Sequence, residues 1–255
     1  MKYLTHYTKL NTLLNYILNE NKLLLNNISK TNDPFEYTKR LTSVGGSKEY
    51  SNEVYSKIHS IISNVIEKNI RIGCFVYDTG FELTDFTKLK SIVNAPMWAY
   101  YGDNHHGAAI VFDKELLIRA CENVIKYKWA IHSDLITYNE YLQFLNNHPN
   151  HLHLDDIDIN SDISIAEEIF KRAHKFWFNK EPKWSFEDEF RIMIFTESES
   201  QIKVDLSNCI KAVVFGNKVS DFLITSIEKS LAPMEIKCLK ISFDYSLNMI
   251  VGNVT

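Results

Sequence analysis

The spacing of apolar residues along the chain separates stretches that predict helices from stretches that predict strands. Apolar positions three and four residues apart form one stripe on a helix, whereas continuous apolar runs or strict alternation indicate strands. The helical spacing predicts helices near residues 10–18, 54–65, 94–102, 134–146, 163–180 and 219–231. The other apolar segments predict strands near residues 2–8, 21–25, 70–77, 107–113, 123–131, 185–196, 201–206, 210–215 and 235–243.

This order of elements predicts an α+β fold. Helices and strands are interleaved, short strands cluster in the last third of the chain, and no internal repeat is visible. We therefore expect residues 1–255 to form a single domain with a mixed or antiparallel sheet and flanking helices.

Composition narrows the class of protein. Hydrophobic residues make up 45% of the chain and the formal net charge is −4, so we expect a sizeable core and no global basic field that attracts nucleic acid. A local basic channel is compatible with these numbers. The sequence shows no signal peptide and no apolar run near the roughly 20 residues of a spanning helix, which predicts a cytoplasmic protein without a membrane segment. Buried free thiols are expected at Cys74, Cys121, Cys209 and Cys238.

A polar connector is expected at residues 147–162, NHPNHLHLDDIDINSD. It contains several side chains that are able to bind metals: His148, His151, His153, Asp155, Asp156 and Asp158. Their spacing matches no standard zinc pattern, and the Asn and Pro residues among them favour turns. A solvated loop is therefore favoured over a metal site, and no metal is expected.

Residues 183–192, KWSFEDEFRI, bring three ionisable groups together if they form a strand. Alternate side chains then share a face, which would carry Glu187, Glu189 and Arg191. Two interpretations stay open at this point. The face is either a carboxylate pair directed at a substrate, or a solvated surface with a Glu189–Lys183 or Glu187–Arg191 ion pair.

Two other segments combine polar and aromatic side chains. In LTHYT, His6 and Thr8 share a strand face and are suited to bind a ribose diol or an amide, with a solvated edge strand as the alternative. In NAPMWAYYGDNHHG, Tyr100 or Tyr101 is able to stack on a flat heterocycle, with core packing as the alternative. The sequence lacks the glycine-rich motifs of Rossmann and P-loop proteins and the G-x-S-x-G nucleophile motif.

In chain order, LTHYT, TNDPFEY, APMWAYYGDNHHGAAIVFD and KWSFEDEFRI resemble the motifs of a large bacterial and phage domain-of-unknown-function family. Its pattern reads HYT, NDPFE, MWxxY, G-hydrophobic-FD and W-x-x-E-x-E-x-R, and the resemblance runs from residue 3 to about residue 195. The family looks like a distant member of the ADP-ribosyltransferase superfamily, near the AbiGi-type abortive-infection proteins and the DarT-type DNA ADP-ribosyltransferases. An ADP-ribosyltransferase-like fold is therefore expected.

The resemblance implies a role for each motif, with NAD as the substrate. The first-strand His and the Thr two residues later would hold a ribose or the nicotinamide amide, and a tyrosine would stack on nicotinamide. The second Glu of E-x-E would contact the nicotinamide ribose, while the first would orient the acceptor or the following Arg. The cofactor-binding candidates are thus His6, Thr8, Tyr100, Tyr101 and Arg191, and the catalytic candidates are Glu189 and Glu187. The S-T-S element of the superfamily is not visible.

The resemblance implies an NAD-dependent mono-ADP-ribosyltransferase that modifies nucleic acid or protein. Such an enzyme would serve as a toxin or anti-phage effector, with an antitoxin or defence-system partner. One alternative is a non-catalytic module that senses a nucleotide or a phage component. Another is an enzyme resembling RNA 2′-phosphotransferases, for which the available basic residues are Lys2, Lys9, Lys39, Arg40 and Arg71.

Overall fold

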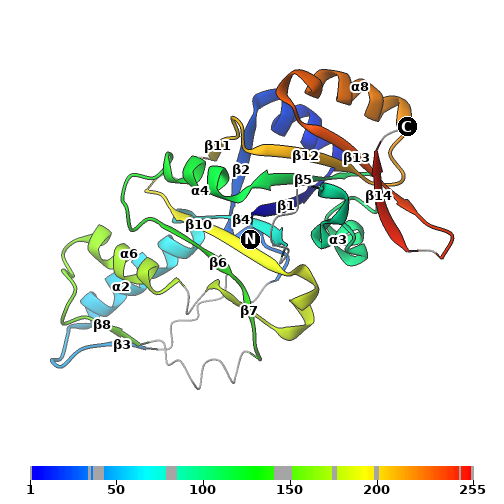
Figure 1. Ribbon diagram of the computed structural model, residues 1–255. Coiled ribbons are helices and arrows are strands. Elements are labelled where there is room, and N and C mark those ends of the chain that lie inside the picture. The colour runs from blue at the N-terminus through cyan, green and yellow to red at the C-terminus, as the bar shows by residue number, and fades with distance from the viewer. Residues whose placement is uncertain are drawn as a thin grey trace.

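A large, mostly antiparallel sheet organises the molecule (Figure 1). The computed structural model describes residues 2–33, 36, 43–78, 85–140, 151–173, 177–197, 201–246 and 248–253. Within these residues the sheet has ten strands in the order β11-β2-β4-β1-β5-β12-β13-β14, and β10 pairs with both β4 and β6. The β12–β13 pair is parallel, so the sheet is mixed. The described residues therefore form a single α+β domain, as the order of elements predicted.

The strands of the large sheet are β1 (Tyr3–Thr8), β2 (Lys22–Asn27), β4 (Ile70–Tyr77), β5 (Ala108–Asp113), β6 (Ile131–Leu135), β10 (Glu189–Phe195), β11 (Ile202–Asp205), β12 (Ile210–Phe215), β13 (Lys237–Phe243) and β14 (Met249–Asn253). Two short parallel pairs lie apart from it: β3 (Ser43–Gly45) with β8 (His151–His153), and β7 (Thr137–Tyr138) with β9 (Asn179–Lys180).

The α-helices are α1 (Leu10–Thr12), α2 (Asn52–Asn64), α3 (Ala95–Tyr100), α4 (Lys114–Glu122), α6 (Asp162–Lys171) and α8 (Asp221–Leu231). The π-helical segments η1 (Leu13–Leu18) and η3 (Val65–Asn69) extend α1 and α2, and the 3₁₀ turns are η2 (Ile28–Lys30), η4 (Phe86–Lys88), η5 (Lys90–Ile92), η6 (Pro182–Glu187) and η7 (Ala232–Met234). Serine side chains start three of the helices, since Ser51, Ser161 and Ser220 each accept a hydrogen bond from a backbone N–H of the first turn.

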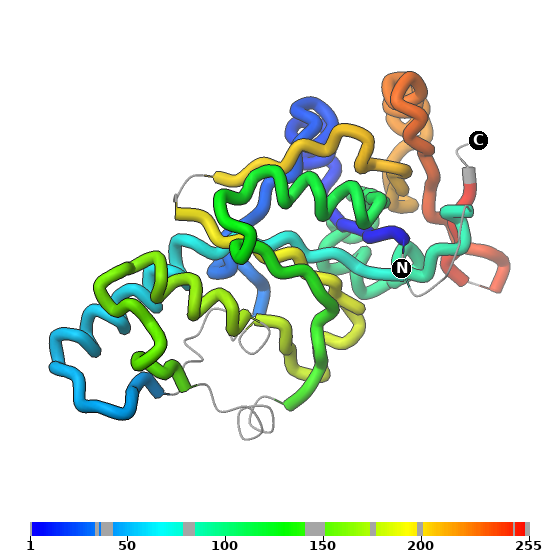
Figure 2. The backbone as a smooth tube through the Cα atoms, turned by 60° about the vertical axis from the view of Figure 1, so that its left-hand side comes forward, coloured from blue at the N-terminus to red at the C-terminus, as the bar shows by residue number. Residues whose placement is uncertain are grey.

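The two faces of the sheet are covered by different helices. One face packs against η1, α4 and α8. The other face carries α2 and α6 at one end and α3 at the other, in two separate apolar clusters. Figure 2 shows the α2–α6 end and α8 on opposite sides of the molecule.

The alternation of side chains along β10 places Glu189 and Arg191 between the α2–α6 cluster and the α3 cluster. Phe190 and Ile192 join the core under α4, whereas Met193 and Phe195 join the α2–α6 cluster on the opposite face. Glu189 and Arg191 have the same parity as Met193, so they lie on that opposite face, towards the α3 end.

Four predicted elements need correction. The strand expected at 123–131 is a series of turns, and the strand β6 begins only at Ile131. The helix expected at 134–146 is wrong for its described part, which continues β6 and forms β7; residues 141–146 lie outside the described residues. The helix expected at 163–180 is interrupted after Lys171, where α6 ends. Ala173 and Trp177 are again helical, but residues 179–180 form a strand that pairs with β7. Residues 131–138 and 179–180 pair with strands that are distant in the sequence, and such contacts override local periodicity.

The strand expected at 185–196 begins only at Glu189. Residues 182–187 form the 3₁₀ turn η6 instead, which Pro182 opens without the N–H that a strand ladder would need. Asp188 follows with φ 40° and ψ 51°, a left-handed conformation that Asp tolerates better than most residues. The chain therefore turns sharply between the two glutamates of the E-x-E motif.

Candidate functional site

A gap between two strands on one edge of β4 creates the main pocket. β10 pairs with one edge of β4 along Ile70–Val76. On the other edge, β1 pairs at Val76 and Tyr77, and β2 pairs at Arg71 and Ile72. No register partner from β1 or β2 faces residues 73–75, and a cavity of about 190 Å³ lies there. Because the sheet is open at this point, side chains from both of its faces reach one pocket.

The pocket collects residues from distant parts of the chain. Four of the residues expected at the site line it: His6, Tyr101, Glu187 and Glu189. Glu36 and Lys180, to which the sequence assigned no role, also line it. The polar rim on the side of β2 and η2 consists of Asn26, Asn27, Lys30, Thr31 and Asn32.

His6 enters the gap as a neutral hydrogen-bond acceptor. Its Nδ1 lies 3.0 Å from the carbonyl oxygen of Cys74, which accepts only, so Nδ1 carries the proton. Burial lowers the pKa of His6, which favours the neutral ring. The second ring nitrogen, Nε2, then keeps a lone pair for a ligand.

Cys74 also lines the pocket, but its thiol is not set up as a nucleophile. Burial, reinforced by the charge of Glu189, raises the pKa of this thiol well above its ordinary value. A neutral thiol is a poor nucleophile. The four cysteines are free thiols, and Cys121, Cys209 and Cys238 are buried, as predicted.

A buried ion cluster forms the floor of the pocket. Arg191 donates two hydrogen bonds to Glu189, from Nε to Oε1 at 2.6 Å and from Nη2 to Oε2 at 3.0 Å. Lys180 Nζ adds an ion pair to Glu189 Oε2 at 2.7 Å. Burial alone would raise the pKa of Glu189, but Arg191 and Lys180 outweigh it and hold that pKa well below its usual range. Glu189 is therefore a permanent carboxylate.

Glu187 contacts the same lysine but behaves differently. Lys180 Nζ lies 2.6 Å from Glu187 Oε2, and the hydroxyl of Tyr101 donates to Oε1 at 2.5 Å. Burial raises the pKa of Glu187, and the opposing effect of Lys180 does not cancel it. Two carboxylates two residues apart thus have pKa values shifted in opposite directions, which suits one for proton transfer and the other for fixed charge.

Glu36 completes the cluster from a separate segment. Its Oε1 contacts Arg191 Nη2 and lies 3.6 Å from Lys180 Nζ. Only 1% of Glu36 is exposed. Glu36 belongs to the NDPFE motif, and this motif is the sequence feature that could have identified Glu36 as a site residue. No sequence feature indicated Lys180, because it lies at the end of the helix predicted at 163–180.

Three expected residues, Thr8, Tyr100 and Arg191, do not line the pocket. Thr8 is buried where β1 pairs with β5, and Tyr100 is 69% exposed with its ring stacked on Phe186 at 5.7 Å. Of the two candidate tyrosines, Tyr101 is therefore the one that lines the pocket. Arg191 is fully buried, and it contacts Glu189 without lining the cavity itself. The ion pairs proposed for a solvated face are also corrected, because Glu189 pairs with Arg191 and Glu187 with Lys180, all buried.

A second cavity of about 250 Å³ adjoins the first and has a basic lining. It shares Leu24, Asn26, Asn27 and Lys30 with the first pocket. Three cations line it, Lys30, Lys68 and Arg71, against one acid, Glu67. Among the other basic residues considered for an RNA phosphotransferase, Lys2 and Lys9 line neither cavity, and Lys39 and Arg40 lie outside the described residues.

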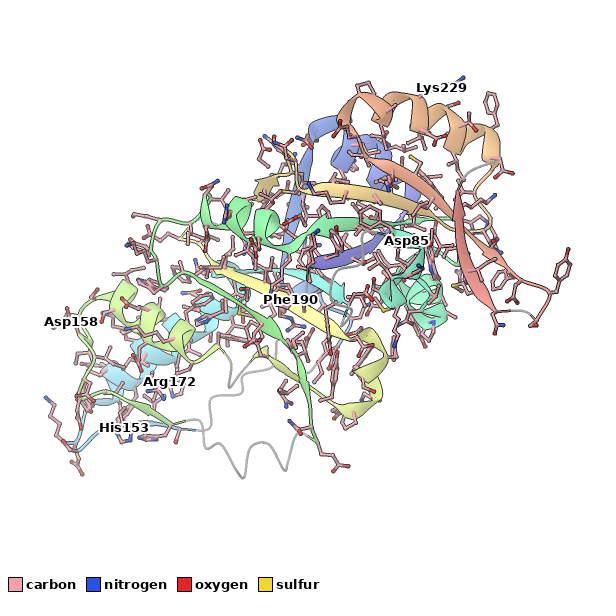
Figure 3. The ribbon with its side chains drawn as sticks, in the orientation of Figure 1. Asp85, His153, Asp158, Arg172, Phe190 and Lys229 are labelled. Atoms are coloured by element: carbon pink, nitrogen blue, oxygen red, sulfur yellow. The ribbon has the colours of Figure 1, made fainter. Side chains whose placement is uncertain are left out.

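The polar connector lies apart from this site. Figure 3 shows His153 and Asp158 at the α2–α6 end, away from Phe190 of β10. His151 and His153 form part of the short strand β8 rather than a loop, and His148 lies outside the described residues. In the part of the chain that is described, no group of three or more His, Cys, Asp or Glu side chains is placed to hold a metal ion. None of the described helices is both long and apolar enough to cross a bilayer.

Part of this site lies in a segment that one protein-family model matches. A sequence model described as "Protein of unknown function (DUF2971)" matches residues 97–192, which run from α3 to β10. No curated protein and no solved structure matches the chain. Tyr101, Glu187, Glu189 and Arg191 lie inside the matched segment, whereas His6 and Glu36 precede it. The match supports a domain-of-unknown-function family for this chain, so its activity has to be argued from the pocket.

Proposed function

We propose that the chain is an NAD-dependent mono-ADP-ribosyltransferase and that the pocket beside β10 holds the nicotinamide ribose of NAD. One observation carries this proposal. Three distant segments contribute His6, Tyr101, and the pair Glu187 and Glu189 to one pocket, in which the two carboxylates have oppositely shifted pKa values. Such pairs of titratable groups in a cavity are typical of active sites.

The sizes of the two cavities suit a ligand that extends through both. The first, at about 190 Å³, is smaller than the roughly 300–1,000 Å³ of most small-molecule sites, so it accepts one end of a dinucleotide only. The adjoining cavity, with Lys30, Lys68 and Arg71, provides positive charge for the diphosphate.

The charge of the pocket favours the reactive end of NAD. With all groups ionised, the buried cluster of Glu36, Glu187 and Glu189 with Lys180 and Arg191 has a net charge of −1, whereas the exposed Lys30 at the rim is not part of this cluster. The nicotinamide ring of NAD is cationic, and positive charge moves onto the ribose as the glycosidic bond breaks. Fixed negative charge in a buried site stabilises that transition state.

The proposed reaction assigns a task to each group. The bond between ribose C1 and the ring nitrogen breaks, and its electron pair leaves with nicotinamide, which becomes neutral. An oxygen or nitrogen of the acceptor attacks C1 and loses a proton to Glu187, whose raised pKa suits a general base. His6 Nε2 accepts a hydrogen bond from the ligand, and Glu189 supplies constant negative charge.

Nicotinamide release tests the proposal. Purified protein is incubated with labelled NAD and, separately, with DNA, RNA or a protein lysate. We expect release of nicotinamide and transfer of label in at least one mixture. The variants Glu187→Gln and Glu189→Gln should each lower kcat by about 100-fold or more, because a preorganised electrostatic contact is lost. Glu168→Gln, on the far helix α6, is the control and should keep full activity.

A non-catalytic sensor is the second candidate, and the pairing of Glu189 favours it. Both carboxylate oxygens of Glu189 already accept charged hydrogen bonds, which weakens the field that this group exerts on a ligand. Under this alternative NAD binds without turnover. Calorimetric binding of NAD combined with no nicotinamide release would support the sensor over the enzyme.

A further inference from the structure

The carboxylate oxygens of the ion cluster do not all have hydrogen-bond partners. Both oxygens of Glu187 accept hydrogen bonds, one from Tyr101 and one from Lys180. Glu189 also uses both, on Arg191 and Lys180. Glu36 uses only Oε1, and its Oε2 is buried with no hydrogen-bond partner.

An unpartnered carboxylate oxygen in a buried position needs an explanation. Burial removes water from such an atom, and the folded protein loses free energy unless another donor replaces it. Glu36 cannot turn its charge to solvent, since its side chain is 1% exposed and its other oxygen is held by Arg191. It lines the pocket, so a ligand in the pocket is able to supply the missing donor.

We propose that Glu36 Oε2 is the ligand-binding acceptor of the pocket and takes a hydrogen bond from an N–H or O–H group of the bound molecule. Glu187 and Glu189 then act on the ligand through charge and proton transfer, while direct recognition falls to Glu36. The role of Arg191 and Lys180 is to fix Glu36 in place. The identity of the ligand rests on the proposed function, but the need for a donor does not.

Together with His6, this residue defines the chemistry that the pocket accepts. His6 Nε2 is an acceptor and Glu36 Oε2 is an acceptor, so a matching ligand carries donors, as a carboxamide NH₂ or a ribose diol does. A carboxylate or phosphate at the same place would meet the like charge of Glu36. The pocket is therefore specific for a donor-bearing, neutral or cationic group.

The first test uses nicotinamide riboside and calorimetry. Wild-type protein is compared with Glu36→Gln, which keeps the size of the side chain and removes its charge. A lost hydrogen bond to a charged group should weaken binding by about 10- to 100-fold. Glu168→Gln is the matched control and should bind like the wild type. Equal affinities of wild type and Glu36→Gln for nicotinamide riboside overturn the inference.

A second test is independent of NAD chemistry, and its main comparison uses the wild-type protein alone. Methylammonium carries N–H donors and tetramethylammonium carries none, although both are monovalent cations. Wild-type protein should bind methylammonium more tightly, with NMR shifts at residues of the pocket, and Glu36→Gln should lose the preference. Wild-type protein that binds the two cations equally, or neither of them, contradicts the role of Glu36. Absence of NAD turnover with a clear preference for methylammonium would remove the proposed enzyme and leave this inference standing.

Discussion

The two adjoining cavities carry opposite charge and are built in opposite ways. In the acidic pocket the charged side chains of Glu36, Lys180, Glu187, Glu189 and Arg191 are between 0% and 6% exposed and are paired with one another. In the basic cavity Lys30 and Lys68 are exposed, and of the three cations only Arg71 is buried. Burial with mutual pairing fixes the geometry of a charge, whereas exposed lysines remain adaptable and screened by salt.

This difference suggests a division of labour between the cavities. Fixed groups discriminate between ligands, because a misplaced donor or charge in a buried site is costly. Exposed cations contribute attraction and association rate more than selectivity. The acidic pocket should therefore determine which ligand end is accepted, and the basic cavity should determine how strongly a phosphorylated ligand is held.

The largest expected effect comes from breaking the acidic cluster at its centre. Arg191→Met removes the guanidinium that pairs with Glu189 and Glu36 and leaves two buried carboxylates poorly compensated. We expect a loss of about 3–5 kcal/mol in the free energy of unfolding, measured by urea denaturation. Arg172→Met, which removes a partly exposed partner of Glu168, should cost about 1 kcal/mol or less. Equal losses for the two variants would show that the cluster is not a structural centre.

A smaller effect is expected from the basic cavity. The double variant with Lys30→Ala and Lys68→Ala should weaken NAD binding by about 1–2 kcal/mol, a factor of about 5–30. Binding of nicotinamide riboside, which lacks the diphosphate, should change little. Calorimetry at two salt concentrations measures both, and the difference between the ligands should shrink at high salt. A matched loss for both ligands would place the phosphate elsewhere.

The smallest effect is a pH dependence that belongs to Glu187. Burial raises the pKa of this carboxyl, so it becomes negative only as the pH rises through a value above the ordinary 4.3 or so. The affinity for the cation 1-methylnicotinamide should therefore increase with pH, by less than the loss expected for the lysine double variant. Neutral nicotinamide should show a weaker trend, and Glu187→Gln should flatten the curve. An affinity for the cation that falls as the pH rises would contradict this sign.

The sequence predicted the central strands well. β4 and β5 are mostly apolar runs, and β1 is rich in tyrosine and threonine, which favour strands. It failed where pairing with a distant strand decides the structure. Apolar periodicity extended the helix before Lys180 too far, although residues 179–180 pair with β7. Nothing local in that segment indicates a strand two residues long.

The candidate site shows the same limit. Strand alternation correctly put Glu189 and Arg191 on one face, but it could not reveal that Asp188 is left-handed and that Glu187 reaches the cluster from a turn. The ion-pair partners were therefore wrong. The importance of Lys180 and Glu36 arises from burial against residues far away in the chain, which no spacing rule contains.

The most direct test of the proposed function is nicotinamide release from NAD by the wild-type chain and by Glu187→Gln, measured over a range of NAD concentrations up to saturation. Because Glu187 is able to accept a proton and Glu189 stays negatively charged, we expect measurable nicotinamide release by the wild type. We also expect a decrease of about 100-fold or more in kcat for the variant, with a nearly unchanged KM. Melting temperature on the same samples reports whether the variant is folded. A folded Glu187→Gln that releases nicotinamide as fast as the wild type, or a folded wild type that releases none with any acceptor, would contradict the account.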